Sequence, residues 1–370
     1  MTPELQLVIA AARVRPSPLA MDRIAQILAG TLDWSLVLAL AAAHSVRPPV
    51  LKNLAAFMPT GQRDRLQSEC AAISAHNLLL AGELAHVMTA LTNAGIPALA
   101  FKGPVLAQQL HGDVTLREFS DLDIQAPRHL IWQAVEILRP LGYECELGRG
   151  GRAAEAYLDS ECELMLTHPA GHSVDLHWAF SASFYRPFPL LVPSHPQSVQ
   201  LFGAEIRTFS PADCALFAIG HFYRHGCWSA KGVADTAAVL ERLSSDQWLQ
   251  VLDAAAAMGC RRMVLFAARA AVHFHQARLP PAAGIGPGSG PKWLAGAVAA
   301  CERMIVNSTA GTPGAIPRLR LRLSQIDSPL ARIRHATHWL VAPRKALWLS
   351  HPKPALLLHC LTHPLADRRP

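Results

Sequence analysis

A pair of aspartates inside one short apolar run constrains the fold of this chain more than any other feature. Asp121 and Asp123 alternate with Leu122 and Ile124. Because successive side chains of a β-strand point to opposite faces, this alternation predicts a strand with both carboxylates on one face and both apolar side chains in the core. Two carboxylates so close repel each other unless a cation neutralises them, and hard divalent ions prefer oxygen ligands. The run therefore predicts a metal site on the face of a sheet.

A third carboxylate lies in a second run of the same kind. In residues 173–178, Ser-Val-Asp-Leu-His-Trp, Asp175 and His177 alternate with apolar residues. If this strand lies beside that of Asp121 and Asp123, three carboxylates converge on one patch, an arrangement that serves two-metal phosphoryl or nucleotidyl transfer. We expect Asp121 and Asp123 to hold both ions, and Asp175 to share the ion that activates the acceptor hydroxyl. A hairpin with a merely polar outer face is the alternative.

The segment before the first aspartate pair has the composition of a phosphate site. Residues 98–101 form an apolar run suited to a buried strand, and a helical pattern follows. Lys102 and Gly103 lie at this junction, where the free N–H groups of a helix start can bind an anion and glycine allows close approach. Arg117, whose guanidinium can form two parallel hydrogen bonds, and Ser120 come next. These four residues predict a site for a triphosphate, although each alone is also compatible with an exposed surface position.

The remaining patterns predict an α+β fold in which helical segments surround a small central α/β unit. The predicted parts are an N-terminal helical region (1–90), an α/β core (91–208), a helical lobe that closes the cleft (209–280), a Gly/Pro-rich linker (281–292) and a basic, mostly helical C-terminal region (293–370). Within the core, residues 161–168 and 172–178 flank a Pro-Ala-Gly turn and predict a β-hairpin, and residues 143–147 predict a further strand.

Composition excludes several classes of protein. A chain of 370 residues with 51% apolar and 16% charged residues is neither disordered nor confined to one small core. No apolar run approaches the ~18–20 residues of a bilayer-spanning helix. Glu4 precedes the first apolar stretch and Arg13 follows it, the reverse of a secretory signal. We therefore expect a cytoplasmic protein without a membrane span.

Cysteine spacing and charge limit the partners of the chain. The eight cysteines include no C-x-x-C pair, which argues against a zinc ribbon and favours small, buried, reduced side chains. Of the net charge of +7, the C-terminal segment 315–370 contributes ten Lys or Arg against two Asp. Such a basic region can meet phosphate, an acidic partner or a membrane surface, and a solvated basic face is the equally open alternative.

The motifs together resemble a known family. Residues 102–124 read K-G-x-x-L-A-x-x-L-x-G-D-x-x-L-R-x-x-S-D-L-D-I, and V-D-L-H-W follows at 174–178. This pattern resembles the bacterial "uncharacterised nucleotidyltransferase" family of the polymerase-β-like nucleotidyltransferase superfamily, over roughly residues 75–280. The resemblance implies a small mixed sheet flanked by helices, Mg²⁺-dependent use of an NTP, and metal-binding roles for Asp121, Asp123 and Asp175. The superfamily's common Gly-Ser pair is Gly-Pro here, at residues 103–104, so Lys102 or Arg117 would replace the serine's phosphate contact.

The helical segment 221–235 resembles the same family more loosely, with Lys231 where arginine is usual. His221 and His225 are four residues apart, the spacing of a zinc pair, but no glutamate completes an H-E-x-x-H motif. We expect this lobe to close over the nucleotide, with Lys231 and Asp235 as an i, i+4 pair facing the cleft. A weak ion pair on the surface is the alternative interpretation.

Three functions remain open at this stage. The first is a Mg²⁺-dependent (or Mn²⁺-dependent) nucleotidyltransferase that moves a nucleoside monophosphate from an NTP, with ATP as the first candidate, to an acceptor hydroxyl or phosphate and releases pyrophosphate. Its acceptor would be a small molecule, a peptide or protein hydroxyl, or an RNA end. The second is a catalytically inactive nucleotide-binding or scaffold protein of the same fold. The third is a metal-dependent phosphohydrolase that uses His177, which faces the same way as Asp175.

Overall fold

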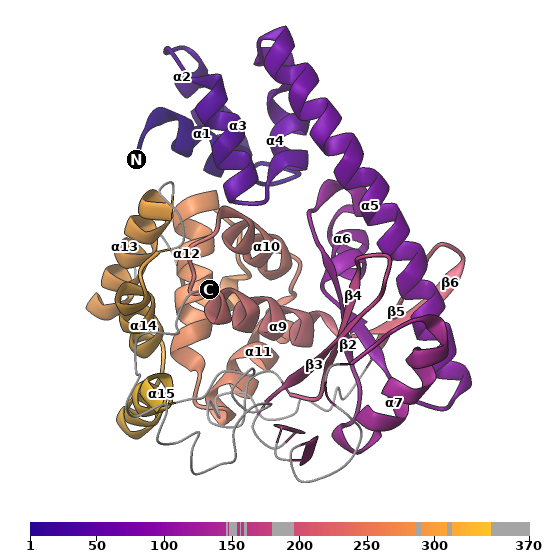
Figure 1. Ribbon diagram of the computed structural model, residues 1–370. Helices are drawn as coiled ribbons and strands as arrows, with labels where there is room; N and C mark the ends of the chain where they lie inside the picture. The colour runs from indigo at the N-terminus through magenta and orange to yellow at the C-terminus, as the bar shows by residue number, and fades with distance from the viewer. Residues whose placement is uncertain are drawn as a thin grey trace.

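The computed structural model describes residues 1–145, 147, 154–155, 157–158, 161–179, 196–285, 290–308 and 313–341, without the side chains of residues 334 and 338–341. Figure 1 shows one small sheet beside a larger assembly of helices. The predicted α+β class is confirmed, and so is the predicted small mixed sheet flanked by helices. Helical segments precede and follow this sheet in the sequence, as predicted. The division into five parts stays a prediction.

A mixed four-stranded sheet positions the acidic residues. Its strands are β1 (Leu99–Phe101), β2 (Asp121–Gln125), β3 (Glu163–Thr167) and β4 (Ser173–His177), in the spatial order β1-β2-β4-β3. The central strands β2 and β4 are parallel, and each outer strand is antiparallel to its neighbour. The strands predicted around residues 98–101 and 121–124 and the predicted hairpin are thereby confirmed.

The two faces of this sheet differ in chemistry, as the alternation of residues predicts. The even-numbered apolar residues of β2 and β4 are buried in one cluster with side chains of α5 (Thr60–Asn93) and α7 (Ile131–Leu138). The opposite face carries the acidic residues and Phe101, whose ring packs against Phe209 and Phe217. Because Phe217 belongs to α9 (Pro211–Arg224), this helix borders the polar face of the sheet.

The N-terminal helices are α1 (Pro3–Ala11), α2 (Pro18–Leu28), α3 (Trp34–Ala43) and α4 (Arg47–Leu54), with a short η1 (Ala55–Phe57) before α5. Thr2 and Ser17 cap α1 and α2 by accepting a hydrogen bond from a first-turn amide, and each precedes a proline, which is favoured at the first helical position. The long helix α5 then runs from this group to the sheet (Figure 1).

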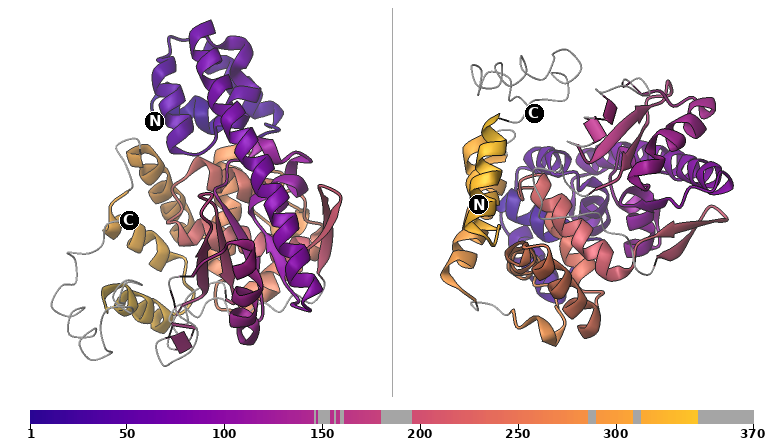
Figure 2. Two further views of the ribbon diagram at one scale, coloured as in Figure 1. Left: turned by 45° about the vertical axis from the view of Figure 1, so that its right-hand side comes forward. Right: turned by 90° about the horizontal axis from the view of Figure 1, so that it is seen from below.

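The remaining helices form the larger part of the molecule. They are α6 (Gly103–His111), η2 (Val114–Leu116), η3 (Arg128–Leu130), η4 (Arg139–Leu141), α9, α10 (Ala230–Leu240), α11 (Ser245–Ala257), α12 (Arg261–His275), η6 (Pro281–Ala283), α13 (Lys292–Asn307), α14 (Ala315–Ser324) and α15 (Pro329–Val341). One buried apolar cluster joins α1, α3 and α4 to α9–α13. Figure 2 agrees with Figure 1 in placing α13–α15 and the four-stranded sheet on opposite sides of the molecule.

Two local features differ from the expectations. The described residues of the segment 143–147, which exclude 146, form only an isolated bridge between Glu144 and Thr167, and the side chain of Tyr143 is buried in the core. A second hairpin, β5 (Gln197–Leu201) and β6 (Ala204–Thr208), was not predicted. Its turn residues Phe202 and Gly203 both have positive φ, and Phe-Gly lacks the Asn-Gly or Asp-Gly signal of such turns.

None of the described helices is long and apolar enough to cross a bilayer. Residues 286–289 of the expected linker and residues 309–312 and 342–370 of the expected basic region lie outside the described residues.

Candidate active site

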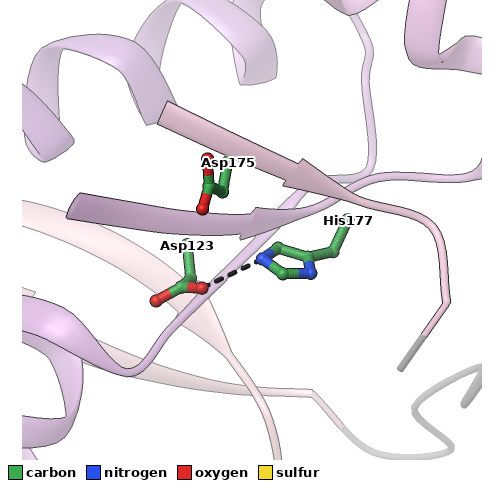
Figure 3. A group of neighbouring side chains, drawn as sticks. All are labelled: Asp123, Asp175 and His177. Carbon is green, nitrogen blue, oxygen red and sulfur yellow. Dashed lines mark hydrogen bonds and ion pairs between the residues drawn. The ribbon is translucent and has the colours of Figure 1, made fainter. Parts of the chain in front are cut away.

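Asp123 and Asp175 meet at the centre of the sheet. They are register partners across the parallel strands β2 and β4, so both side chains project from the same face. His177, two residues further along β4, projects from that face as well, and ligand atoms of the three residues lie within 4.8 Å of one another. Figure 3 shows the imidazole reaching the Asp123 carboxylate, with the Asp175 carboxylate beside them. Two separated stretches of chain thus bring two carboxylates and one imidazole to one point.

Asp121 lies on the same face, at the first position of β2. It is half-buried and stands outside the closely spaced group of three. Burial and the neighbouring charge of Asp123 raise the pKa of the Asp121 carboxyl. Asp121 is therefore near enough to Asp123 for the two charges to interact.

Lys102 and Gly103 form the turn from β1 into α6, and both have positive φ angles, of 54° and 38°. A non-glycine residue in this region costs about 1–3 kcal/mol and persists only where its surroundings hold it there. A Cβ on Gly103 would lie 3.2 Å from the backbone oxygen of Asp121, so glycine lets the start of α6 approach β2 closely. This turn places Lys102 Nζ 2.7 Å from Oδ1 of Asp123, to which it donates a hydrogen bond.

Lys102 and His177 both form hydrogen bonds with the Asp123 carboxylate. The Asp123 side chain is only 4% exposed. His177 Nε2 lies 2.9 Å from the same Oδ1 that Lys102 contacts. Burial opposes ionisation most strongly, yet the charge of Lys102 and the hydrogen bond from His177 outweigh it and hold the pKa of Asp123 well below its usual range. Both hydrogen bonds go to Oδ1, which leaves Oδ2 outside them.

Asp175 is in the opposite situation. Its Oδ1 is buried without a hydrogen-bond partner in the described part of the chain. Burial, followed by the negative charges of Glu163, Asp123 and Asp121, raises the pKa of Asp175 to about 6. A buried carboxylate without a donor destabilises a fold unless a proton or a cation neutralises it.

Glu163 and Arg224 complete the surroundings of His177, and neither was expected from the sequence. Glu163 is the register partner of His177 across β3 and β4, and its carboxylate lies 3.3 Å from Nδ1 of the imidazole. Arg224, in the last turn of α9, pairs with both oxygens of Glu163. The symmetry of the hairpin about its Pro-Ala-Gly turn could have placed Glu163 opposite His177, but no sequence signal links Arg224 to either residue.

Arg117 and Asp235 form a second ion pair, between the end of η2 and α10. Arg117 donates from Nε and Nη2 to the Asp235 carboxylate at 3.0–3.1 Å, and its side chain is 6% exposed. Asp235 therefore pairs with Arg117 rather than with Lys231, the i, i+4 partner that the sequence suggested. Burial and the charge of Arg117 lower the pKa of Lys231 to about 8.

The other expected residues lie around this site. Ser120 is exposed and lines, together with Lys231, a pocket of about 470 Å³ beside α5. His221 and His225 have ring centroids 4.2 Å apart at the end of α9, and burial together with the charge of Lys102 lowers the pKa of His221. In the described ranges, this histidine pair does not belong to a group of three metal-ligating side chains.

Comparison with known families identifies the chain. The model of a family described as an uncharacterised nucleotidyltransferase matches residues 30–276, well over half of the sequence. The chain belongs to this family. The resemblance to an uncharacterised nucleotidyltransferase family, inferred from the motifs, is thereby confirmed.

Two solved structures are similar to parts of this nucleotidyltransferase family member. One is the solution structure of the antibiotic-resistance factor ANT(2'')-Ia, at 16% identity over 47% of this chain and 89% of that chain, with a TM-score of 0.33. The other is the crystal structure of an antigenic nucleotidyltransferase-like protein from Paracoccidioides brasiliensis, at 17% identity over 55% and 95% of the two chains, with a TM-score of 0.32. No curated protein matches the chain.

Nucleotidyltransferases generally use divalent metal ions, and the residues of this site fit such an ion. The donor set contains two carboxylates and an imidazole within 4.8 Å of one another. The buried Oδ1 of Asp175 lacks a partner among the described residues, as expected for an atom that a cation would satisfy. A predominance of carboxylate oxygens favours a hard ion over a soft one.

Proposed function

We propose that this protein is a Mg²⁺-dependent nucleotidyltransferase that transfers a nucleoside monophosphate from an NTP, with ATP as the first candidate, to an acceptor hydroxyl or phosphate. The in-register pairing of Asp123 with Asp175 on parallel strands is the observation that carries this proposal. The family to which the chain belongs supports it independently. Mn²⁺ is the other ion that this donor set would accept.

Each acidic residue has a separate role in this proposal. Asp121, Asp123 and Asp175 would hold two ions of the polymerase-β-like arrangement, which when bound neutralise the carboxylates and the charge that develops on the transferred group. The acceptor oxygen forms its bond to the α-phosphorus, the bond to the β-phosphate oxygen breaks, and pyrophosphate leaves. Asp175 would accept the acceptor's proton as a general base.

The nucleotide would bind along the start of α6. Ser120 directly precedes Asp121 in the sequence, and Gly103 packs against the backbone oxygen of Asp121. The positive charges of Lys102 and Arg117 both favour the ionised form of the Asp121 carboxyl. Pro104 removes one of the backbone N–H groups that a helix start offers to phosphate, so the lysine and arginine charges carry more of the binding. We assign His221, His225, Lys231 and Asp235 to the helical side of the cleft.

The proposal is tested by label transfer. The protein is incubated with each α-labelled NTP and Mg²⁺ in host extract, and wild type is compared with Asp121→Ala/Asp123→Ala. Asp253→Ala, which removes an exposed carboxylate from α11, is the matched control. We expect label on an acceptor with wild type and Asp253→Ala, and none with the double variant. Equal labelling by all three proteins would refute the proposal.

Two observations favour the alternative of a nucleotide-binding protein without turnover. Lys102 occupies Oδ1 of Asp123, and Gly103-Pro104 lacks the serine common in the superfamily. Label transfer separates the two functions, because Mg²⁺ with ATP would stabilise either protein in a thermal-shift titration while only the enzyme transfers label.

A further inference from the structure

A small pocket rich in positive charge lies next to the proposed active site. Its volume is about 200 Å³, and it is bordered by α10, η2, the end of α6 and the segments after α1 and α3. Its charged lining, called here the basic pocket, comprises five cations and two carboxylates, namely Arg13, Arg15, Arg117, Lys231 and Arg242 with Asp235 and Glu241. The lining thus carries a surplus of three positive charges.

The two carboxylates are already engaged. Glu241 is paired with Arg13, and Asp235 is paired with Arg117. Among the described residues, no carboxylate contacts Arg15 or Lys231. Within the part of the chain that the structure describes, Arg15, Lys231 and Arg242 therefore form no ion pair, and the guanidinium of Arg242 donates to the backbone carbonyl oxygen of Leu110.

Arg117 provides a second indication that the basic pocket can bind an anion. Its Nε and Nη2 are bound to Asp235, but its Nη1 is buried and has no partner among the described residues. Buried guanidinium nitrogens are almost always satisfied, and a carboxylate or phosphate oxygen is the group that satisfies them best. His111, which also lines the pocket, does not compete, because burial lowers its pKa to about 4 and leaves it neutral.

The basic pocket is close to the metal-binding aspartates. Lys231 lines this pocket and also the neighbouring one that contains Ser120, the residue before Asp121. The charges of Lys231 and Arg117 both act on Asp121 and favour its ionised form. A molecule in the basic pocket would therefore lie against two cations whose charges reach Asp121, at the end of α6 and not at its start.

We propose that the basic pocket binds the acceptor of the transfer reaction, and that this acceptor is a small molecule carrying a phosphate or carboxylate group. This inference rests on the proposed function, since a transferase needs a second binding site beside its nucleotide. A volume of about 200 Å³ lies below the ~300–1,000 Å³ of drug-sized ligand pockets, so it suits a small metabolite and not an RNA end or a folded protein.

Lys231 allows a direct test on the wild-type protein. An amine with a pKa of about 8 is partly neutral at mildly alkaline pH and can attack an aldehyde. Pyridoxal phosphate, an aldehyde that carries a phosphate, would condense with Lys231 to an imine and release water. Borohydride then reduces the imine to a stable secondary amine, and peptide mass spectrometry locates it.

We expect pyridoxal phosphate to label Lys231 in preference to the exposed Lys52 and Lys292, and about tenfold more than pyridoxal does, since the phosphate adds charge-assisted hydrogen bonds. Inorganic phosphate and acetate are added as competitors in separate arms, and the better protector identifies the anion class. Equal labelling by pyridoxal, or protection by neither anion, would overturn the proposal. Labelling mainly at Lys102 would also overturn it, because the anion would then bind at the start of α6.

Two further proteins separate this inference from the proposed function. Arg15→Gln removes an exposed, uncompensated cation of the pocket and should reduce labelling of Lys231, whereas Arg207→Gln, an exposed arginine of β6, should not. Asp121→Ala/Asp123→Ala should abolish nucleotidyl transfer and keep the preference of Lys231 for pyridoxal phosphate over pyridoxal, a ratio that does not depend on the effect of Asp121 on the Lys231 amine. Labelling without any transfer by the wild type would refute the proposed function and leave an anion site, while transfer without selective labelling would refute the acceptor pocket alone.

Discussion

Asp123 and Asp175 are direct register partners on parallel strands, yet their environments differ sharply. Lys102 and His177 both donate to Asp123, whereas Oδ1 of Asp175 is buried without a partner among the described residues. The pKa values of the two carboxyls move in opposite directions for this reason, down for Asp123 and up to about 6 for Asp175. In the absence of metal, the first carboxylate is therefore neutralised by the protein and the second is not.

The stability of the metal-free protein should consequently depend on Asp175. Because its pKa is about 6 when folded and 3.8 ordinarily, the folded state binds the proton more tightly. The unfolding free energy then falls as pH rises from about 4 to about 6, by at most about 3 kcal/mol. We expect Asp175→Asn to remove this slope and to be more stable than wild type at pH 7.5, measured by urea unfolding in a chelator.

Mg²⁺ provides the control for that measurement. If the ion binds beside Asp175, saturating Mg²⁺ should flatten the slope of the wild type and leave Asp175→Asn almost unchanged. If the unfolding free energy of wild type and of Asp175→Asn depends on pH in the same way in the chelator, the environment assigned to the Asp175 carboxyl is wrong.

Lys102 should compete with the metal for Asp123. Removing one partner of a buried ion pair costs about 3 kcal/mol, because the other charge stays buried and uncompensated, so Lys102→Met should be less stable than wild type. The same variant should bind Mg²⁺ more tightly, since the ion no longer displaces an ammonium group from Asp123. Isothermal titration of Mg²⁺ into both proteins measures this.

The matched variant for Lys102→Met is Lys52→Met, which removes an exposed ammonium group from α4. It should change stability by no more than about 0.5 kcal/mol and leave Mg²⁺ affinity unaltered. Weaker Mg²⁺ binding by Lys102→Met than by Lys52→Met would mean that Lys102 assists the metal site rather than competing with it.

The central strands could be predicted from the sequence because their signals are local. The alternation around Asp121 and Asp123 and that around Asp175 each fix a strand and a polar face within five residues. The family motif adds that these two strands belong to one site. The parallel pairing itself, which makes Asp123 and Asp175 partners, is reported only by the structure.

The partners supplied by the helices could not be predicted in this way. Arg224 lies 61 residues from Glu163, and Asp235 lies 118 residues from Arg117. A pairing over such a separation depends on how the helical lobe packs on the sheet, and no periodicity of 2 or 3.6 residues encodes it. The i, i+4 rule instead favoured Lys231 as the partner of Asp235, because that rule considers one helix in isolation.

The pair of Arg224 and Glu163 should stabilise the contact between α9 and the sheet only modestly. Arg224 is 41% exposed, so solvent and salt screen the interaction. A double-mutant cycle with Arg224→Gln and Glu163→Gln should give a coupling energy of about 1 kcal/mol or less, falling further in high salt. A coupling above about 3 kcal/mol that resists salt would show that the pair is effectively buried.

The pair of Arg117 and Asp235 should behave differently, because both side chains are largely buried and the contact is bidentate. Asp235→Asn leaves the guanidinium uncompensated, and we expect it to lower the unfolding free energy by about 3–5 kcal/mol. Asp253→Asn, on the exposed face of α11, should stay within about 0.5 kcal/mol of wild type. Urea midpoints at constant m-value measure both changes. Added inorganic phosphate should restore more stability to Asp235→Asn than to wild type, because a bound anion replaces the lost carboxylate beside Arg117. If phosphate stabilises the two proteins equally, Arg117 does not face the anion in the basic pocket.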